Sequence, residues 1–328
     1  MGDRSTAIIS TGRALPTSKV TNRDLEEIVE TNDEWITGRT GISERRMITN
    51  DETNSKLSVK AARTALNRAG LEPKDVDMLI VTTVTPDTPL PSTACLVQAE
   101  LGAYNASAFD LAAGCTGFLY GMNIADQFIK NEAAETVLLV GVDTLSPIVD
   151  WQDRNTCVLF GDGAGAVVLR AAGENQGILA SKMFSDGKKA ELLHVPGGGA
   201  RTPATYRTID ERLHYIKMNG SEVFKFAVKI MVESTLQVLE HCNKKPEDLD
   251  FLIPHQANVR IIKSASKKLG LPEDRVLINI QRYGNMSSAS IPVLMDETLE
   301  EGKIQRGNLI GLVSFGAGLT WGAVVLKW

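Results

Sequence analysis

The chain has 328 residues, with 35 basic and 40 acidic side chains and a formal net charge of −5 at pH 7. This balance argues against a general nucleic-acid binder, which needs a basic face, and an aromatic content of 5% leaves few side chains for base stacking. No apolar run approaches the roughly 18 residues of a membrane helix, and the four cysteines lie too far apart for a zinc site. We therefore expect a cytoplasmic protein with reduced thiols and without a bound metal, and with neither a nucleic acid nor a membrane as partner.

An internal repeat begins early in the chain. Residues 73–80 read Pro-Lys-Asp-Val-Asp-Met-Leu-Ile, and residues 246–253 read Pro-Glu-Asp-Leu-Asp-Phe-Leu-Ile, so the numbering offset is 173 (246 minus 73). The helices that precede these segments align at the same offset without a gap, each with an apolar seam at helical spacing. The repeat predicts two α/β halves, residues 1–172 and 173–328, each with a mostly buried sheet covered by helices.

Cys115 follows a predicted strand over residues 107–111 and precedes a predicted helix over residues 116–129, between Gly114 and Gly117. A thiol at a helix start faces free backbone N–H groups and the positive end of the helix dipole. We therefore expect a lowered thiol pKa, and the same N–H groups can hold an oxyanion. Although many free cysteines act as small buried hydrophobes, this position favours a nucleophile.

The segment 161–166, Gly-Asp-Gly-Ala-Gly-Ala, matches the residue pattern of a dinucleotide-binding fingerprint but not its structural context. That fingerprint requires a helix after the glycines, whereas β-branched residues follow here. The pentapeptide Gly-Ala-Val-Val-Leu begins within this segment, at residues 165–169, and recurs at residues 322–326. The pattern predicts a strand, a glycine turn and a returning strand in each half, without a nucleotide site.

Two further polar residues stand at predicted element ends in the second half. His255 lies in the segment 254–258, which directly follows the apolar strand that ends at Ile253, at the edge of an open α/β sheet where functional loops gather. Histidine is also the commonest acid or base in catalysis. Asn285 is a turn asparagine by its local sequence, but the repeat sets it opposite Cys115, at the start of the matching helix.

A basic stripe follows His255. Arg260, Lys263 and Lys267 recur at i, i+3 and i+7 on one predicted helix face, with Lys268 adjacent. Most such faces are simply solvated. In an acidic protein, a basic stripe beside a catalytic loop could instead bind an anionic partner.

Together these segments resemble the β-ketoacyl-acyl carrier protein synthase III family of the thiolase superfamily, the initiating condensing enzymes of type II fatty acid synthesis. The resemblance runs nearly end to end. It rests on residues 31–42, the Cys115 segment, and residues 153–154, 160–165, 254–258, 284–285 and 314–322. It implies a five-layered αβαβα thiolase-like fold built from two duplicated halves. It also implies a homodimer that acts on an acyl-CoA and a malonyl-acyl carrier protein without a cofactor.

The resemblance also assigns residues to roles. It makes Cys115 the acylated nucleophile, His255 and Asn285 its catalytic partners, and the backbone N–H groups of Cys115 and Ala317 the oxyanion hole. Coenzyme A binding is assigned to Trp35, Arg39, Arg154 and Asn258. The acyl pocket is assigned to Leu90 and Phe315, and carrier-protein docking to Lys225, Arg260, Lys267 and Lys268.

Three positions depart from the commonest family pattern. Gly114 stands where alanine is usual, Ala317 stands where glycine is frequent, and Leu90 stands where some members carry phenylalanine at the floor of the acyl pocket. The departure at Ala317 matters little, because a backbone group is used there. The departure at Leu90 leaves the preferred acyl chain open.

The predicted reaction is a decarboxylative Claisen condensation through an acyl-Cys115 intermediate. A condensing enzyme of secondary metabolism stays open, because it could keep the same three residues. A biosynthetic thiolase is disfavoured, since the final glycine loop, residues 314–318, has no second cysteine. A cysteine-type α/β-hydrolase acting on thioesters is a further alternative, because residues 113–117 loosely match a nucleophile elbow. The complete Cys-His-Asn set argues against a catalytically inactive binding protein.

Overall fold

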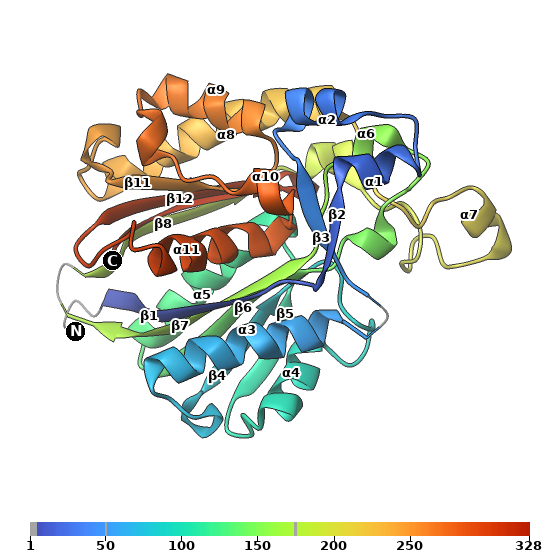
Figure 1. The fold of residues 1–328 in the computed structure, drawn as a ribbon. Helices are drawn as coiled ribbons and strands as arrows, with labels where there is room; N and C mark the ends of the chain where they lie inside the picture. Colours follow the sequence, from blue (N-terminus) through green and yellow to red (C-terminus); the bar gives the residue numbers. More distant parts are fainter. Residues whose placement is uncertain (1–4, 50, 174–175) are drawn as a thin grey trace.

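Two mixed sheets form the framework of the molecule (Figure 1). The computed structural model describes residues 5–49, 51–173 and 176–328. The first sheet has the order β1 (Ser5–Ala14), β7 (Gly163–Ala172), β6 (Thr136–Asp143), β4 (Met78–Thr82) and β5 (Ser107–Leu111). β4 runs parallel to β5 and β6, and β7 runs antiparallel to its neighbours. β4 and β6 are buried throughout, as expected for strands covered on both faces.

The second sheet repeats most of the first. Its order is β11 (Phe251–Pro254), β12 (Leu309–Gly316), β13 (Thr320–Lys327) and β8 (Gly177–Ser185). The start of β12 matches the start of β6 at the offset of the sequence repeat (309 minus 136). The counterpart of β5 is reduced to an isolated bridge between Leu252 and Val276.

Helices make the three remaining layers (Figure 1). The outer layers are α3 (Asn54–Ala69) and α4 (Thr93–Leu101) on the first sheet, and α8 (Gly220–His241) and α9 (Val259–Leu269) on the second. The central layer contains α5 (Gly117–Lys130) and α11 (Ser290–Glu300). Nine of the eleven residues of α11 are buried, as expected for a helix enclosed between two sheets.

Short elements surround one end of the sheets. Near the top of the first half they are β2 (Ser18–Thr21), α1 (Asn22–Glu26), α2 (Asp33–Thr40), β3 (Glu44–Met47) and α6 (Arg154–Cys157). In the second half they are β9 (Leu193–His194), α7 (Tyr206–Asp210), β10 (Lys217–Met218) and α10 (Ile280–Tyr283). The segment around α7 extends away from the layered body (Figure 1).

Each central helix is preceded by a short 3₁₀ turn. Gly114–Thr116 precedes α5, and Ser287–Ala289 precedes α11, again at the offset of the sequence repeat (287 minus 114). The exact counterpart of Cys115 is therefore Ser288, and Asn285 lies three positions earlier. The sequence prediction that Asn285 matches Cys115 is thus three positions out of register.

The glycine segment after Phe160 leads directly into strand β7. The predicted strand is confirmed, and no helix follows the glycines as a dinucleotide site would require. Among the helices of the described residues, none is both long and apolar enough to cross a membrane.

Candidate active site

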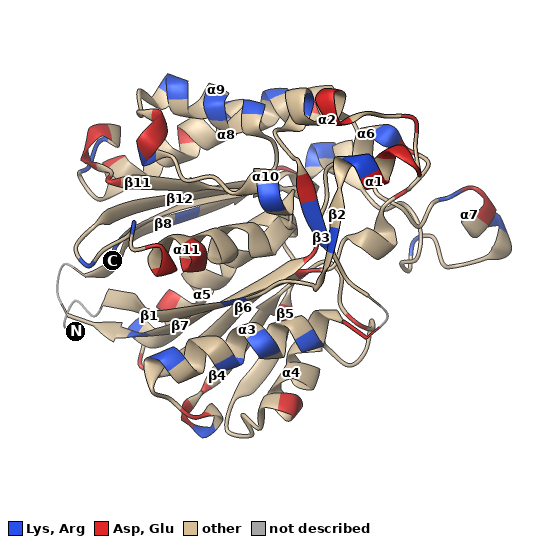
Figure 2. Cartoon of the chain, viewed as in Figure 1, with Lys and Arg blue, Asp and Glu red and all other residues tan. Residues whose placement is uncertain are grey.

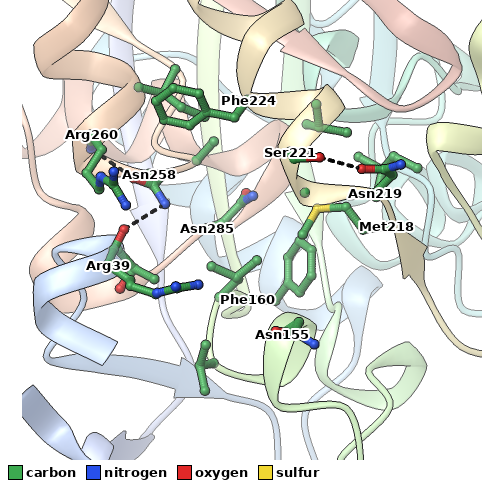
Figure 3. Close-up of a pocket in the computed structure, with 18 of the residues that line it drawn as sticks. Arg39, Asn155, Phe160, Met218, Asn219, Ser221, Phe224, Asn258, Arg260 and Asn285 are labelled. Atoms are coloured by element: carbon green, nitrogen blue, oxygen red, sulfur yellow. Dashed lines mark hydrogen bonds between the residues drawn. The ribbon is translucent and has the colours of Figure 1, made fainter. Parts of the chain in front are cut away.

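A cavity of about 910 Å³ lies where the two halves meet, and Cys115, His255 and Asn285 all line it. Cys115 comes from the turn after β5, His255 directly follows β11, and Asn285 lies between α10 and α11. Figure 3 shows the side chain of Asn285 near the centre of this cavity. Segments that are distant in the sequence thus bring the three predicted side chains to one space, near the carboxyl ends of parallel strands.

Cys115 lies where two loops are in direct backbone contact. A Cβ atom on Gly316 would lie 2.4 Å from the backbone nitrogen of Cys115, and a Cβ atom on Gly114 would lie 2.7 Å from the backbone nitrogen of Ala317. At such distances a Cβ atom on either glycine would require the facing backbone to shift. The Ser314 hydroxyl donates a hydrogen bond to the Cys115 carbonyl oxygen at 2.8 Å and fastens the contact. This crossing keeps the backbone of Cys115 close to that of Ala317, the two predicted oxyanion-hole residues.

The Cys115 thiol has a raised pKa, so the expected lowering by the helix dipole is wrong for this structure. The pKa of the thiol is raised to about 12, chiefly by burial and also by the buried carboxylate of Asp143, although the nearby Ser287 side chain lowers it. The residue is half-buried and lines the cavity, yet the surrounding protein makes burial the largest cause of the shift. Loss of hydration of the thiolate outweighs the dipole of α5.

His255 is enclosed and neutral. The residue is 1% exposed, and its backbone N–H donates to the Val313 carbonyl oxygen at 2.8 Å. Its ring meets the edge of Phe315 at 5.6 Å between centroids. Burial lowers the pKa of the imidazole to about 3. At neutral pH the ring therefore carries one proton and can donate a single hydrogen bond into the cavity.

Asn285 is held by its backbone and by its amide oxygen. Its N–H donates to the Leu159 carbonyl oxygen at 2.9 Å, and its carbonyl oxygen accepts from the Gly161 N–H at 3.0 Å. The Oδ1 atom accepts from the Ser287 N–H at 2.8 Å. This bond assigns the orientation of the amide and leaves Nδ2 as a donor toward the cavity.

The predicted coenzyme A residues gather at one side of the cavity. The Arg39 guanidinium lies 5.1 Å and the Arg154 guanidinium 4.3 Å from the Trp35 ring centre. Asn258 donates from Nδ2 to the Arg39 carbonyl oxygen at 3.1 Å, joining α9 to α2 (Figure 3). Trp35, Arg39 and Asn258 line the cavity, whereas Arg154 contacts Trp35 from α6. An indole flanked by guanidinium groups suits a flat aromatic base with phosphates.

The predicted carrier-docking residues lie along one exposed surface. Lys225 and Arg260 line the cavity, and Lys267 and Lys268 are exposed in the last turn of α9. Figure 2 shows basic residues following one another along α9. The four cations therefore extend outward from the cavity along the second half.

The two predicted acyl-pocket residues lie in different surroundings. Phe315 is 4% exposed and lines the cavity. Leu90 is 86% exposed and does not line it, because the loop after β4 turns its side chain outward. Sequence reasoning missed the apolar residues that do line the cavity, among them Val158, Leu159, Phe160, Leu193, Met218 and Val223. The position of Phe160 directly before the first glycine turn was a usable signal for one of them.

Within the described ranges, no group of three or more His, Cys, Asp or Glu side chains is placed to hold a metal ion. The site is instead a thiol beside two uncharged donors. Two stacked mixed sheets, a pair of central helices and this site define a condensing enzyme of the thiolase fold.

Comparisons with known proteins agree. The family models for the 3-oxoacyl-acyl carrier protein synthase III and its C-terminal region match residues 109–187 and 239–328. The chain is 55% identical to a β-ketoacyl-acyl carrier protein synthase III of Natranaerobius thermophilus, over 98% of both chains. It therefore belongs to the β-ketoacyl-acyl carrier protein synthase III family, whose members are acyltransferases that carry out the initiating condensation of fatty acid synthesis.

Solved structures give the same result for the fold. The 3-oxoacyl-acyl carrier protein synthase III of Aquifex aeolicus VF5 superposes with a TM-score of 0.92 at 49% identity, covering 98% of this chain and 100% of that one. The priming β-ketosynthase of the R1128 polyketide pathway also gives a TM-score of 0.92, at 31% identity, covering 99% and 96%. The five-layered fold is thus confirmed, and the α/β-hydrolase alternative is wrong, because that fold has a single central sheet.

Proposed function

We propose that the chain joins an acyl-CoA primer to malonyl-acyl carrier protein and releases carbon dioxide, coenzyme A and a β-ketoacyl-acyl carrier protein. The observation that carries the proposal is the cavity shared by Cys115, His255 and Asn285. A thiol suits acyl transfer, and two neutral N–H donors suit an enolate. A carboxylate in place of either donor would repel the negative charge that develops.

In the first step the Cys115 sulfur attacks the thioester carbon of the acyl-CoA. The backbone N–H groups of Cys115 and Ala317 stabilise the tetrahedral oxyanion, which collapses by breaking the bond to the coenzyme A sulfur. Because the thiol is protonated in the free protein, its proton must move during the attack. The proton ends on the departing coenzyme A sulfur, which leaves as a thiol.

In the second step malonyl-carrier protein occupies the place left by coenzyme A. Its carboxylate leaves as carbon dioxide, and the electron pair of the broken bond forms an enolate. The N–H of His255 and Nδ2 of Asn285 stabilise the enolate oxygen. The enolate carbon attacks the acyl carbonyl, and collapse of the second oxyanion expels the Cys115 thiolate, which is then reprotonated. The groups named here need no further cofactor.

Binding follows from the surroundings of the cavity. We assign the adenine ring of coenzyme A to Trp35 with Arg39 and Arg154, the last of which must shift from the indole face to admit the ring. Asn258 holds the backbone of this region. The cations at Lys225, Arg260, Lys267 and Lys268 would dock the acidic carrier so that its pantetheine arm reaches the cavity.

We also propose that the chain forms a homodimer in the cytoplasm. β5 is the last strand of the first sheet among the described residues, and its Phe109 and Leu111 side chains are only half-buried. Nearby in the chain, Leu90 is 86% and Tyr104 is 76% exposed. A free strand edge beside exposed apolar side chains favours pairing with a second copy. Such pairing would cover Leu90, which the isolated chain leaves in solvent.

A second candidate, the priming condensation of polyketide synthesis, is favoured only by the likeness to the R1128 enzyme. Activity with malonyl-carrier protein from fatty acid synthesis and short acyl-CoA primers would separate the two, since a polyketide enzyme would prefer its own carrier.

The test of the proposal is the mass of the intact protein after incubation with a series of acyl-CoAs. We expect one acyl adduct on the native chain and none on Cys115→Ala. The adduct that forms fastest also identifies the primer. Persistent acylation of Cys115→Ala would refute the assignment of the nucleophile.

A further inference from the structure

A buried carboxylate lies behind the segment that carries Asn285. Glu297, on the central helix α11, is 4% exposed. Its Oε1 atom accepts a hydrogen bond from the Tyr283 hydroxyl at 2.7 Å. Its Oε2 atom accepts from Asn279 Nδ2 at 3.0 Å and pairs with the Arg282 guanidinium at 2.7 Å. One carboxylate thus fixes α10 at both ends, immediately before Asn285.

A buried amide fixes the same segment to the strand that carries His255. Gln256, the next residue after His255, is fully buried. Its Oε1 atom accepts from the N–H groups of Asn279 and Ile280 at 3.1 and 3.2 Å. Its Nε2 atom donates to the Pro254 carbonyl oxygen at 2.7 Å, at the end of β11. Every polar atom of this amide group therefore serves to hold α10 against the end of β11.

These bonds form one continuous connection between the two donors. Gln256 follows His255 in the chain and accepts a hydrogen bond from Asn279. Asn279 and Tyr283 both donate to Glu297. Only Gly284 separates Tyr283 from Asn285 in the chain. None of the four intermediate residues lines the cavity, so none of them contacts the substrate there. We call Gln256, Asn279, Tyr283 and Glu297 the donor bridge.

We infer that the donor bridge is a positioning device for decarboxylation, which sets the distance and direction between the His255 and Asn285 donors. The inference rests on the proposed roles of those two residues. A displaced donor points away from the enolate oxygen, and shifts near 1 Å can cost a hundredfold in rate. The side-chain hydrogen bonds of the bridge do not involve the Cys115 turn, which is fixed separately by Ser314 and the glycine contact.

The chemistry of the bridge suits a rigid spacer. Burial and the hydrogen bond to Glu297 raise the pKa of Tyr283 to about 12, so the hydroxyl remains a donor at physiological pH. A hydrogen bond to a buried carboxylate is stronger than one between neutral groups. Removing the hydroxyl leaves Oε1 of Glu297 without its partner, which frees α10 to shift.

The experiment compares Tyr283→Phe with Tyr120→Phe. Tyr120 is a suitable control, because its hydroxyl also donates one hydrogen bond, to the Phe184 carbonyl oxygen at 2.6 Å, and it belongs to neither donor nor bridge. Two rates are measured on each variant: formation of the acyl-enzyme from acyl-CoA, by intact mass, and release of ¹⁴CO₂ from malonyl-carrier protein by the preformed acyl-enzyme. The melting temperature is recorded for both variants.

In Tyr283→Phe we expect a loss of tenfold or more in carbon dioxide release, with acylation within twofold of the native rate. Tyr120→Phe should keep both rates. Native carbon dioxide release in Tyr283→Phe would overturn the inference, and so would a parallel fall of both rates, because the bridge would then support only the fold. If Tyr283→Phe does not fold, Glu297→Gln, which keeps the side-chain volume, is judged by the same two rates.

Asn285→Ala is measured in the same series to separate this inference from the proposed function. If Asn285→Ala loses carbon dioxide release while Tyr283→Phe keeps it, the donor bridge alone is wrong. If Asn285→Ala releases carbon dioxide at the native rate, the proposed role of the donor itself is wrong.

Discussion

The two central turns share a backbone and differ in chemistry. Gly114 has a φ of 55° and Ser287 a φ of 47°, so both turns begin with a residue in the left-handed region. In the first turn, a loop of the other half approaches to 2.7 Å from the place where a Cβ atom would lie. In the second turn the left-handed residue keeps a side chain, whose hydroxyl lies near the Cys115 thiol and lowers its pKa.

The difference shows how one duplicated turn supports two parts of a reaction. A nucleophile with an oxyanion hole needs backbone amides from two loops in contact, and glycine permits that approach without a shift of the facing loop. In the described part of the chain, no loop approaches the backbone of Ser287 in this way. Its left-handed backbone costs about 1 kcal/mol or more, because the residue has a Cβ atom. The first half is therefore built around close backbone contact and the second around side-chain donors.

The largest expected effect concerns the thiol of the first half. Because its pKa is raised to about 12, the thiolate fraction should grow tenfold for each pH unit between pH 7 and pH 10, about a thousandfold in all. The rate of Cys115 alkylation by iodoacetamide, followed by intact mass with Cys115→Ala as the background, checks this. A plateau below pH 9 would show that the helix dipole outweighs burial after all.

The next effect comes from Gly316→Ala, which places a methyl group against the Cys115 backbone, 2.4 Å from its nitrogen. We expect acyl-enzyme formation to fall by about a hundredfold, because the two loops must separate. Gly187→Ala is the matched control, since nothing lies within 4 Å of its added Cβ atom. It should keep both its stability and its acylation rate. Equal rates in the two variants would remove the close contact from the explanation.

A smaller effect is expected at Ser287. Ser287→Gly relieves the left-handed backbone and should unfold at a higher temperature than Ser287→Ala, which does not. Both variants lose the nearby hydroxyl that lowers the thiol pKa, so both should slow the alkylation of Cys115, by less than the tenfold that one pKa unit would give. If Ser287→Gly melts no higher than Ser287→Ala, the strain assigned to this turn is absent.

The smallest expected effect is a rate of carbon dioxide release that stays nearly constant with pH. Burial lowers the pKa of His255 to about 3, so its neutral form persists from pH 8 down to pH 5. Release of ¹⁴CO₂ by the preformed acyl-enzyme should therefore vary less than twofold over that range. An imidazole with an ordinary pKa of about 6.5 would be roughly thirtyfold depleted in its neutral form at pH 5, and a decline of that size would contradict the assigned environment.

Much of the fold could be predicted from the sequence, because both halves show the same pattern of apolar residues. The constant offset between the halves identifies β11 as the strand equivalent to β4. The division of the chain at residue 172 stays a prediction as a statement about domains. Likewise the triad, coenzyme A and carrier assignments are proposals that the shared cavity supports.

The remaining features depend on long-range packing. The raised pKa of Cys115 comes from burial and from Asp143, which belongs to another strand, β6, and is distant in the sequence. The outward direction of Leu90 is set by a loop, where no periodicity applies. The donor bridge joins Gln256 to Glu297 through side chains that no sequence motif singles out. Local sequence patterns therefore do not predict the shifted pKa, the direction of Leu90 or the bridge.

The measurement that tests the central claim most directly is the partition of the two steps in Asn285→Ala and His255→Ala. The claim is that Cys115 and the two oxyanion-hole N–H groups perform acyl transfer, and that His255 and Asn285 supply the donors for decarboxylation. Asn285→Ala should form the acyl-Cys115 adduct at the native rate and release at least a hundredfold less ¹⁴CO₂ from malonyl-carrier protein. His255→Ala should lose carbon dioxide release to the same extent. Native carbon dioxide release by either variant would contradict the account.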